Sequence, residues 1–129
     1  MALPVTTTLA AVLGLMLIWL KFRAIGQRVK SEAPLGETAS TSLQVAVRTH
    51  GNFSENAPLA VILIGLLEFG GAPALLVMGL AGVFVFARIM HPIGMGMEKT
   101  PNAPRVMGVM LTSAVFVVGG LYALYMVLV

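Results

Sequence analysis

Side chains that can bind an anion are concentrated between residues 48 and 56. Arg48, Asn52 and Glu55 follow one another at intervals of four and three residues, so on a helix they share one face, with Asn56 at its margin. A guanidinium can hold a carboxylate through two parallel hydrogen bonds. The spacing therefore indicates a polar stripe that could bind a small acidic ligand.

Two later segments carry further basic residues. Arg88 and His91 are three residues apart and so lie on one helical face, and Arg105 opens the last apolar run. A charged side chain that faces lipid costs about 2.5–3.5 kcal/mol, so we expect the arginines and Glu55 to face one another or a water-filled cleft. Glu55 can neutralise one arginine, which leaves two cations available to a ligand with carboxylates.

Each of these residues also has a structural interpretation. Arg48 can form an ion pair with Glu55, seven residues on, that fixes helix packing. Arg88 can extend to the lipid headgroups from a helix end, and Arg105 can be an ordinary basic boundary residue. His91 can serve at a helix end.

The composition places these residues in a membrane protein. The chain has 129 residues, of which 58% are hydrophobic and 10% charged, whereas a soluble domain has about a quarter charged residues. Its net charge of +3 is better explained by membrane orientation than by nucleic-acid binding. The absence of cysteine excludes disulfides, a thiol nucleophile and thiolate metal sites, and no metal is expected.

Four apolar runs are long enough to predict membrane-spanning helices, joined by two polar loops (21–40 and 92–104) and one Gly-Gly-Ala-Pro turn. The first, third and fourth runs are 3–20, 74–90 and 106–129; the second ends at Phe69 and is fully apolar over residues 57–67. Thr41 and Gln44 have the spacing of a capping box, which predicts that the second helix begins near Ser42. The first run precedes its nearest positive charges, so we expect a retained helix rather than a cleaved signal peptide.

In a four-span chain all lysines and arginines fall on one side of the membrane. They are Lys21, Arg23, Arg28, Lys30, Arg48, Arg88, Lys99 and Arg105. The positive-inside rule makes this side cytoplasmic, and both termini then lie on the opposite side.

Three motifs resemble a known family. The segment from Arg48 to Pro58, Arg-Thr-His-Gly-Asn-Phe-Ser-Glu-Asn-Ala-Pro, resembles the second-helix signature of the MAPEG superfamily, the membrane-associated proteins in eicosanoid and glutathione metabolism. Arg88-Ile-Met-His91 and the run from Arg105 resemble its third and fourth helices in short bacterial members. The resemblance implies an all-α integral membrane protein, with residues 1–129 as one four-helix bundle, that assembles as a homotrimer in the bacterial inner membrane.

The resemblance also implies a ligand and the residues that bind it. In the family, glutathione lies between protomers near the cytoplasmic side, and its second-helix ligands correspond to Arg48, Asn52 and Glu55. Further residues would contact the same tripeptide from the first loop and the third helix: Arg28, Arg88 and His91.

Arg105 matches the family arginine that stabilises the glutathione thiolate, which implies glutathione transferase or peroxidase activity on lipophilic electrophiles that arrive from the membrane. Met95 stands where catalytic members often have a tyrosine. Two alternatives stay open: a non-catalytic membrane protein that binds glutathione or an anionic lipid, and a small four-helix exchanger that uses Glu55 as its embedded acid.

Overall fold

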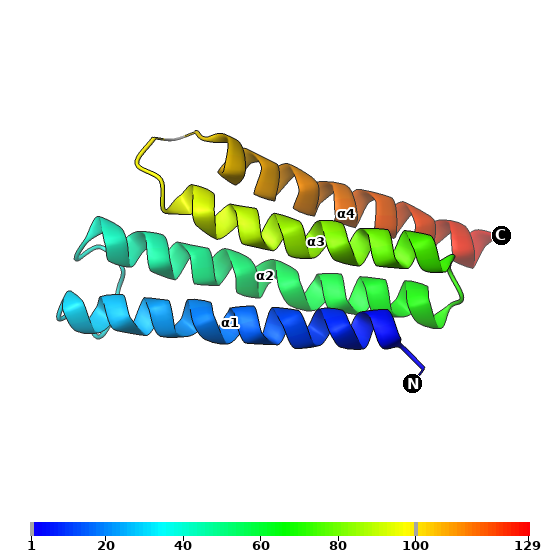
Figure 1. Cartoon of the computed structure of the whole chain (residues 1–129), viewed down its shortest axis with the longest axis horizontal. Coiled ribbons are helices and arrows are strands. Elements are labelled where there is room, and N and C mark those ends of the chain that lie inside the picture. Colours follow the sequence, from blue (N-terminus) through cyan, green and yellow to red (C-terminus); the bar gives the residue numbers. More distant parts are fainter. Residues whose placement is uncertain (1, 100) are drawn as a thin grey trace.

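The structure, a computed structural model, describes residues 2–99 and 101–129 and is built from four long helices. They are α1 (Pro4–Lys30), α2 (Thr41–Phe69), α3 (Ala74–Met95) and α4 (Ala103–Leu128). Consecutive helices run in opposite directions, and the two ends of the chain lie at the same end of the bundle (Figure 1). The structure thus confirms the all-α, four-helix prediction.

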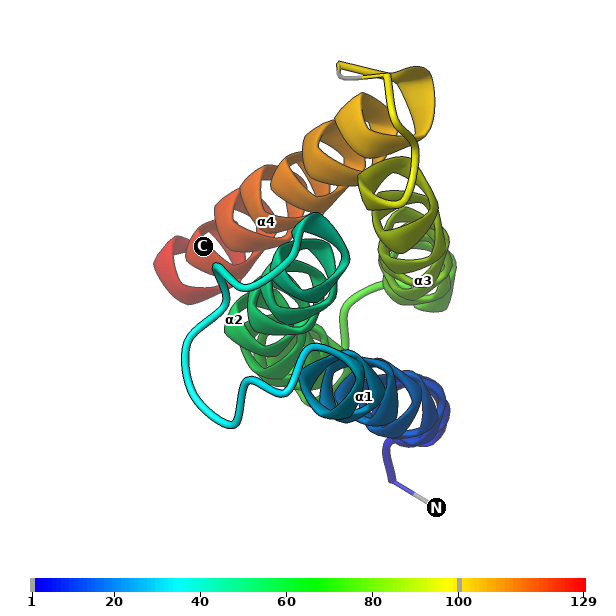
Figure 2. The same cartoon turned by 90° about the vertical axis from the view of Figure 1, so that its left-hand side faces the viewer.

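Three of the four predicted spans meet the requirements for crossing a membrane. In the described chain α1, α3 and α4 are long and apolar enough to do so. α2 has 29 residues and lies beside α1 and α3 in both ribbon views, but polar side chains interrupt it between residues 48 and 56 (Figures 1 and 2). Its fully apolar part is confined to residues 57–67, so its crossing stays a prediction.

Two predicted loops are shorter than expected because two helices continue past the apolar runs. α1 continues from residue 20 to Lys30, since the segment from residue 21 to residue 30 contains no proline and Ala24 still packs in the core. α3 continues through Pro92 to Met95. A proline inside a helix lacks a backbone donor and crowds the carbonyl group of residue i−4, but α3 continues here, where Pro92 and Gly94 are both buried. Hydropathy marked the ends of the apolar runs, not the ends of the helices.

The starts of α2 and α4 are capped by side chains of the preceding residue. The Ser40 hydroxyl accepts a hydrogen bond from the Leu43 amide at 3.1 Å, so the cap lies one residue before the predicted capping box. Asn102 Oδ1 accepts from the Arg105 amide at 3.0 Å.

The start of α1 is capped from another helix. Glu68, near the end of α2, accepts from the Val5 amide at 2.9 Å, and from the amide and hydroxyl of Thr6 at 2.8 and 2.6 Å. Free amides at a helix start favour a negative charge. Within residues 2–99 and 101–129, Glu68 is the only acidic side chain at this end of the bundle, and it ties α1 to α2.

Close contacts between α4 and its neighbours depend on glycine. α4 starts against α3 and crosses the bundle obliquely, so that its end approaches α2 (Figure 2). A Cβ atom on Gly108 would lie 2.9 Å from His91 Cα, and one on Gly119 would lie 3.0 Å from a Leu63 methyl group. Because a larger side chain would not fit at either position, α4 packs on α3 and α2 with these two glycines facing them.

Candidate functional site

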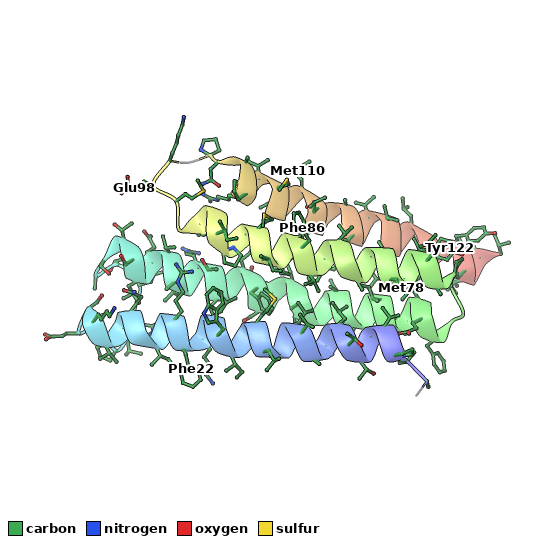
Figure 3. The ribbon with its side chains drawn as sticks, in the orientation of Figure 1. Phe22, Met78, Phe86, Glu98, Met110 and Tyr122 are labelled. Atoms are coloured by element: carbon green, nitrogen blue, oxygen red, sulfur yellow. The ribbon has the colours of Figure 1, made fainter. Side chains whose placement is uncertain are left out.

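A polar cleft of about 450 Å³ opens between α2, α3 and α4 near the basic end of the bundle. Its wall contains five of the seven residues expected to bind a ligand: Arg48, Asn52, Glu55, His91 and Arg105. Glu37, Val47, Gly51 and Met95 complete the lining. Figure 3 shows this end of the bundle, where Glu98 is labelled on the connection between α3 and α4. Residues from three separate helices thus face one volume.

Arg48 forms an ion pair that the sequence did not indicate. Its Nη2 lies 2.9 Å from Oε1 of Glu37, in the connection between α1 and α2, and its side chain is 66% exposed. The predicted structural pair with Glu55 is not formed. Glu37 lies outside any helix, so no helical periodicity could have linked it to Arg48.

Arg88 lies behind the cleft and not on its wall. It is 2% exposed, with its guanidinium 5.4 Å from the centre of the Phe84 ring. It donates to Asn52 Oδ1 at 2.9 Å, to the Gly108 carbonyl oxygen at 3.3 Å, and to the Thr112 hydroxyl. Arg88 therefore neither extends to headgroups nor reaches a ligand in this cleft directly.

The contact with Arg88 fixes the orientation of the Asn52 amide. A guanidinium can only donate hydrogen bonds, so the amide oxygen of Asn52 must face Arg88. The amide NH₂ group is then the end that remains for the cleft. Asn52 consequently presents donors, which suit a carboxylate or a carbonyl oxygen.

His91 and Arg105 reach the cleft because α3 and α4 approach closely at two glycines. Gly108 lies against the backbone of His91, and a Cβ atom on Gly94 would overlap the backbone of Arg105. Asn102 Nδ2 also donates to the Gly94 carbonyl oxygen at 2.8 Å. The start of α4, and with it Arg105, is therefore fixed against the end of α3.

The structure places Arg28 away from the cleft. Its guanidinium donates to the Gly36 carbonyl oxygen at 2.6 Å and so holds the connection between α1 and α2. Arg28 is not among the residues that line the cleft.

The charges of the cleft are more balanced than the sequence suggested. The wall contains two arginines, Arg48 and Arg105, and two carboxylates, Glu37 and Glu55, and the buried Arg88 behind Asn52 brings the formal charge to +3 − 2 = +1. A ligand with several anionic groups and one cationic group matches this arrangement better than a simple polyanion does.

Arg105 also borders a second, apolar groove. This groove of about 460 Å³ runs along the outer face of α4 and is lined by Pro101, Val106, Val109 and Met110. Arg105 thus lines both the polar cleft and the apolar groove. Within residues 2–99 and 101–129, no three carboxylates or imidazoles lie close enough together to hold a metal.

Comparison with known proteins gives consistent matches. A family model described as "MAPEG family" matches residues 6–125. The inner membrane protein YecN of Escherichia coli (strain K12) is 30% identical over 90 residues, which cover 70% of this chain and 69% of the relative. YecN of Escherichia coli O6:H1 matches with the same identity and coverage. No solved structure matches the chain.

Proposed function

The chain belongs to the MAPEG family of membrane proteins, and from this premise we propose that it binds glutathione and conjugates it to lipophilic electrophiles, or uses it to reduce lipid hydroperoxides. The observation that carries the proposal is the convergence of Arg48, Asn52, Glu55 and Arg105 on one cleft. Its volume of about 450 Å³ lies within the range of small-molecule sites, roughly 300–1,000 Å³.

The groups of glutathione match the charges of the cleft. The tripeptide has two carboxylates and one ammonium group. Arg48 and the NH₂ group of Asn52 would donate to the carboxylates, and Glu55 would accept from the ammonium. The Arg48 guanidinium is paired with Glu37, and a carboxylate of glutathione would replace this contact.

Arg105 would act on the sulfur. A guanidinium beside the thiol favours its charged form and lowers the pKa of glutathione, so that the proton is released to water and the thiolate accumulates. The thiolate then forms a carbon–sulfur bond with an electrophile in the groove of Val106, Val109 and Met110, and the leaving group departs with its electron pair. With a hydroperoxide the sulfur attacks oxygen, the O–O bond breaks and an alcohol leaves, and a second glutathione completes the reduction to disulfide and water.

The proposal includes the arrangement in the membrane. The basic end faces the cytoplasm, both termini face the opposite side, α2 crosses with the other helices, and three copies assemble. The positive-inside rule supports the orientation, and family resemblance supports the trimer. Because the chain has no cysteine, single cysteines introduced near each terminus can be labelled from one side of the membrane to test the orientation.

The test uses purified protein in detergent, titrated with glutathione while thiolate absorbance and conjugation of an aryl halide are measured. Arg105→Gln should lower thiolate formation and turnover about tenfold or more, while glutathione still binds. Lys30→Gln is the matched control, since Lys30 is exposed and lies outside the residues that line the cleft, and it should leave both readouts unchanged. The absence of binding at millimolar glutathione would refute the proposal.

A second candidate is a non-catalytic member that binds glutathione alone. Met95 favours it, because this thioether lines the cleft and offers no hydroxyl to a ligand. Binding without turnover, across aryl halides and lipid hydroperoxides, would select this candidate. The exchanger alternative is not favoured, because Glu55 shares its cleft with two arginines, Arg48 and Arg105.

A further inference from the structure

A second polar cleft, of about 380 Å³, lies at the same end of the bundle between α1, the start of α2 and the end of α3. Its polar lining comprises Arg23, Gln27, Thr41, Ser42 and Glu98. The apolar part of the wall is formed by Val45, Met95, Gly96 and Met97. This cleft is distinct from the candidate glutathione site and shares only Met95 with it.

The cleft contains one cation and one anion that are not paired with each other. In the described part of the chain the single ion pair is that between Arg48 and Glu37, so Arg23 and Glu98 lie more than 4.0 Å apart. The Arg23 guanidinium lies beside Gly96, where an added Cβ atom would be 3.8 Å from Nη2. Among residues 2–99 and 101–129, no side chain or carbonyl oxygen accepts a hydrogen bond from Arg23. Its donors therefore remain for a ligand.

The surroundings of the cleft place it at the membrane boundary. On α1, Trp19 lies one turn before Arg23 and is 56% exposed, and Phe22 is 64% exposed. Figure 3 shows Phe22 on the side of α1 that faces away from the other helices. Exposed aromatic side chains beside basic residues are typical of the headgroup level of a bilayer.

We propose that this cleft binds a phospholipid headgroup of the phosphoethanolamine type, which carries a phosphate and a primary ammonium. Arg23 would hold the phosphate through two hydrogen bonds, and the hydroxyl groups of Thr41 and Ser42 would donate to the same oxygens. Glu98 would accept hydrogen bonds from the ammonium.

The pairing of charges distinguishes this headgroup from other common ones. A phosphatidylglycerol headgroup offers no cation to Glu98, and its phosphate lies near that carboxylate. A phosphatidylcholine headgroup has a cation, but its quaternary nitrogen has no N–H to donate. Phosphatidylethanolamine alone among the three satisfies both Arg23 and Glu98.

The experiment counts bound lipids by native mass spectrometry on protein in detergent with equal amounts of the three phospholipids. Wild type should bind phosphatidylethanolamine about five- to tenfold more tightly than the other two. Arg23→Gln should remove this binding, whereas Glu98→Gln should lower it until phosphatidylethanolamine and phosphatidylglycerol bind equally. Lys21→Gln removes the same charge from the same helix outside the cleft and should change nothing.

Equal binding of the three lipids by wild type would overturn the proposal, as would an effect of Lys21→Gln equal to that of Arg23→Gln. Soluble glycerophosphoethanolamine should compete poorly because it lacks acyl chains, and effective competition would overturn the assignment to a lipid. Circular dichroism of each variant shows whether a loss of lipid binding results from misfolding. A glutathione titration of each variant tests the glutathione proposal separately from lipid binding.

Discussion

Replacing Gly108 by alanine should separate α3 from α4, two of the three helices that form the candidate glutathione site. In α4, a Cβ atom at this position would lie 2.8 Å from His91 Cβ and 2.9 Å from both His91 Cα and His91 N. Carbon atoms in contact prefer about 3.5–4.0 Å. The backbone of α3 therefore has to move by up to about 1 Å, and a backbone cannot turn aside as a flexible side chain would.

Two effects of Gly108→Ala lower the free energy of unfolding, and a third partly offsets them. Overpacking of this kind destabilises by about 1–3 kcal/mol. The same movement stretches the hydrogen bond of Arg88 to the Gly108 carbonyl oxygen, already 3.3 Å long, and bonds to charged groups are worth about 1.5–3 kcal/mol. Alanine returns about 1 kcal/mol through its higher helix propensity. The net expectation is a loss of about 1.5–5 kcal/mol for Gly108→Ala.

Thermal unfolding in detergent, followed by circular dichroism, measures this loss as a lower Tm. Gly120→Ala is the matched control, because it lies on the same helix and an added Cβ atom meets nothing within 4 Å. Its Tm should stay unchanged or rise slightly. A Gly108→Ala protein as stable as the Gly120→Ala protein would refute the close approach of α3 and α4 inferred from these contacts.

Three further predictions concern individual side chains. Glu68→Gln should lower the Tm and reduce protection of the first α1 amides from hydrogen exchange, because a neutral amide caps them less well; unchanged exchange would contradict the cap. Arg88→Met should weaken glutathione binding about tenfold, and combining it with Asn52→Ala should add little, because Arg88 acts through Asn52; additive losses would contradict this coupling. Glu37→Gln should release Arg48 and tighten glutathione binding up to about fivefold, whereas weaker binding would contradict the proposed role of Arg48.

The helices were predictable from the sequence where hydropathy and helix formation coincide. The turn at residues 70–73 and the apolar segments of α3 and α4 are examples, because a long apolar segment in a membrane must satisfy its backbone internally. The ends of α1 and α3 were predicted too early. Polar residues 21–30 and the turn around Pro92 are helical because they pack on neighbouring helices, and such contacts are not encoded in local hydropathy.

The shared face of Arg48, Asn52 and Glu55 was also predictable, since helical periodicity alone places them together. The burial of the Arg88 side chain could not be predicted from the sequence. Whether an arginine on a helix points to lipid, to a cleft or into the core depends on how that helix is rotated against its neighbours. Here the contacts of α4 at Gly108 bury Arg88 behind Asn52.

The amino-acid sequence by itself determined that this chain is a membrane protein and that its lysines and arginines lie at one end of the bundle. It also determined which residue types could bind an acidic ligand. These properties follow from the composition, from the positions of the charges along the chain and from the periodicity of a single helix. The tertiary structure decided the partners: Glu37 for Arg48, Asn52 for Arg88, and Glu68 for the start of α1. Partners are set by the approach and rotation of separate helices, which depend on contacts between residues far apart in the chain.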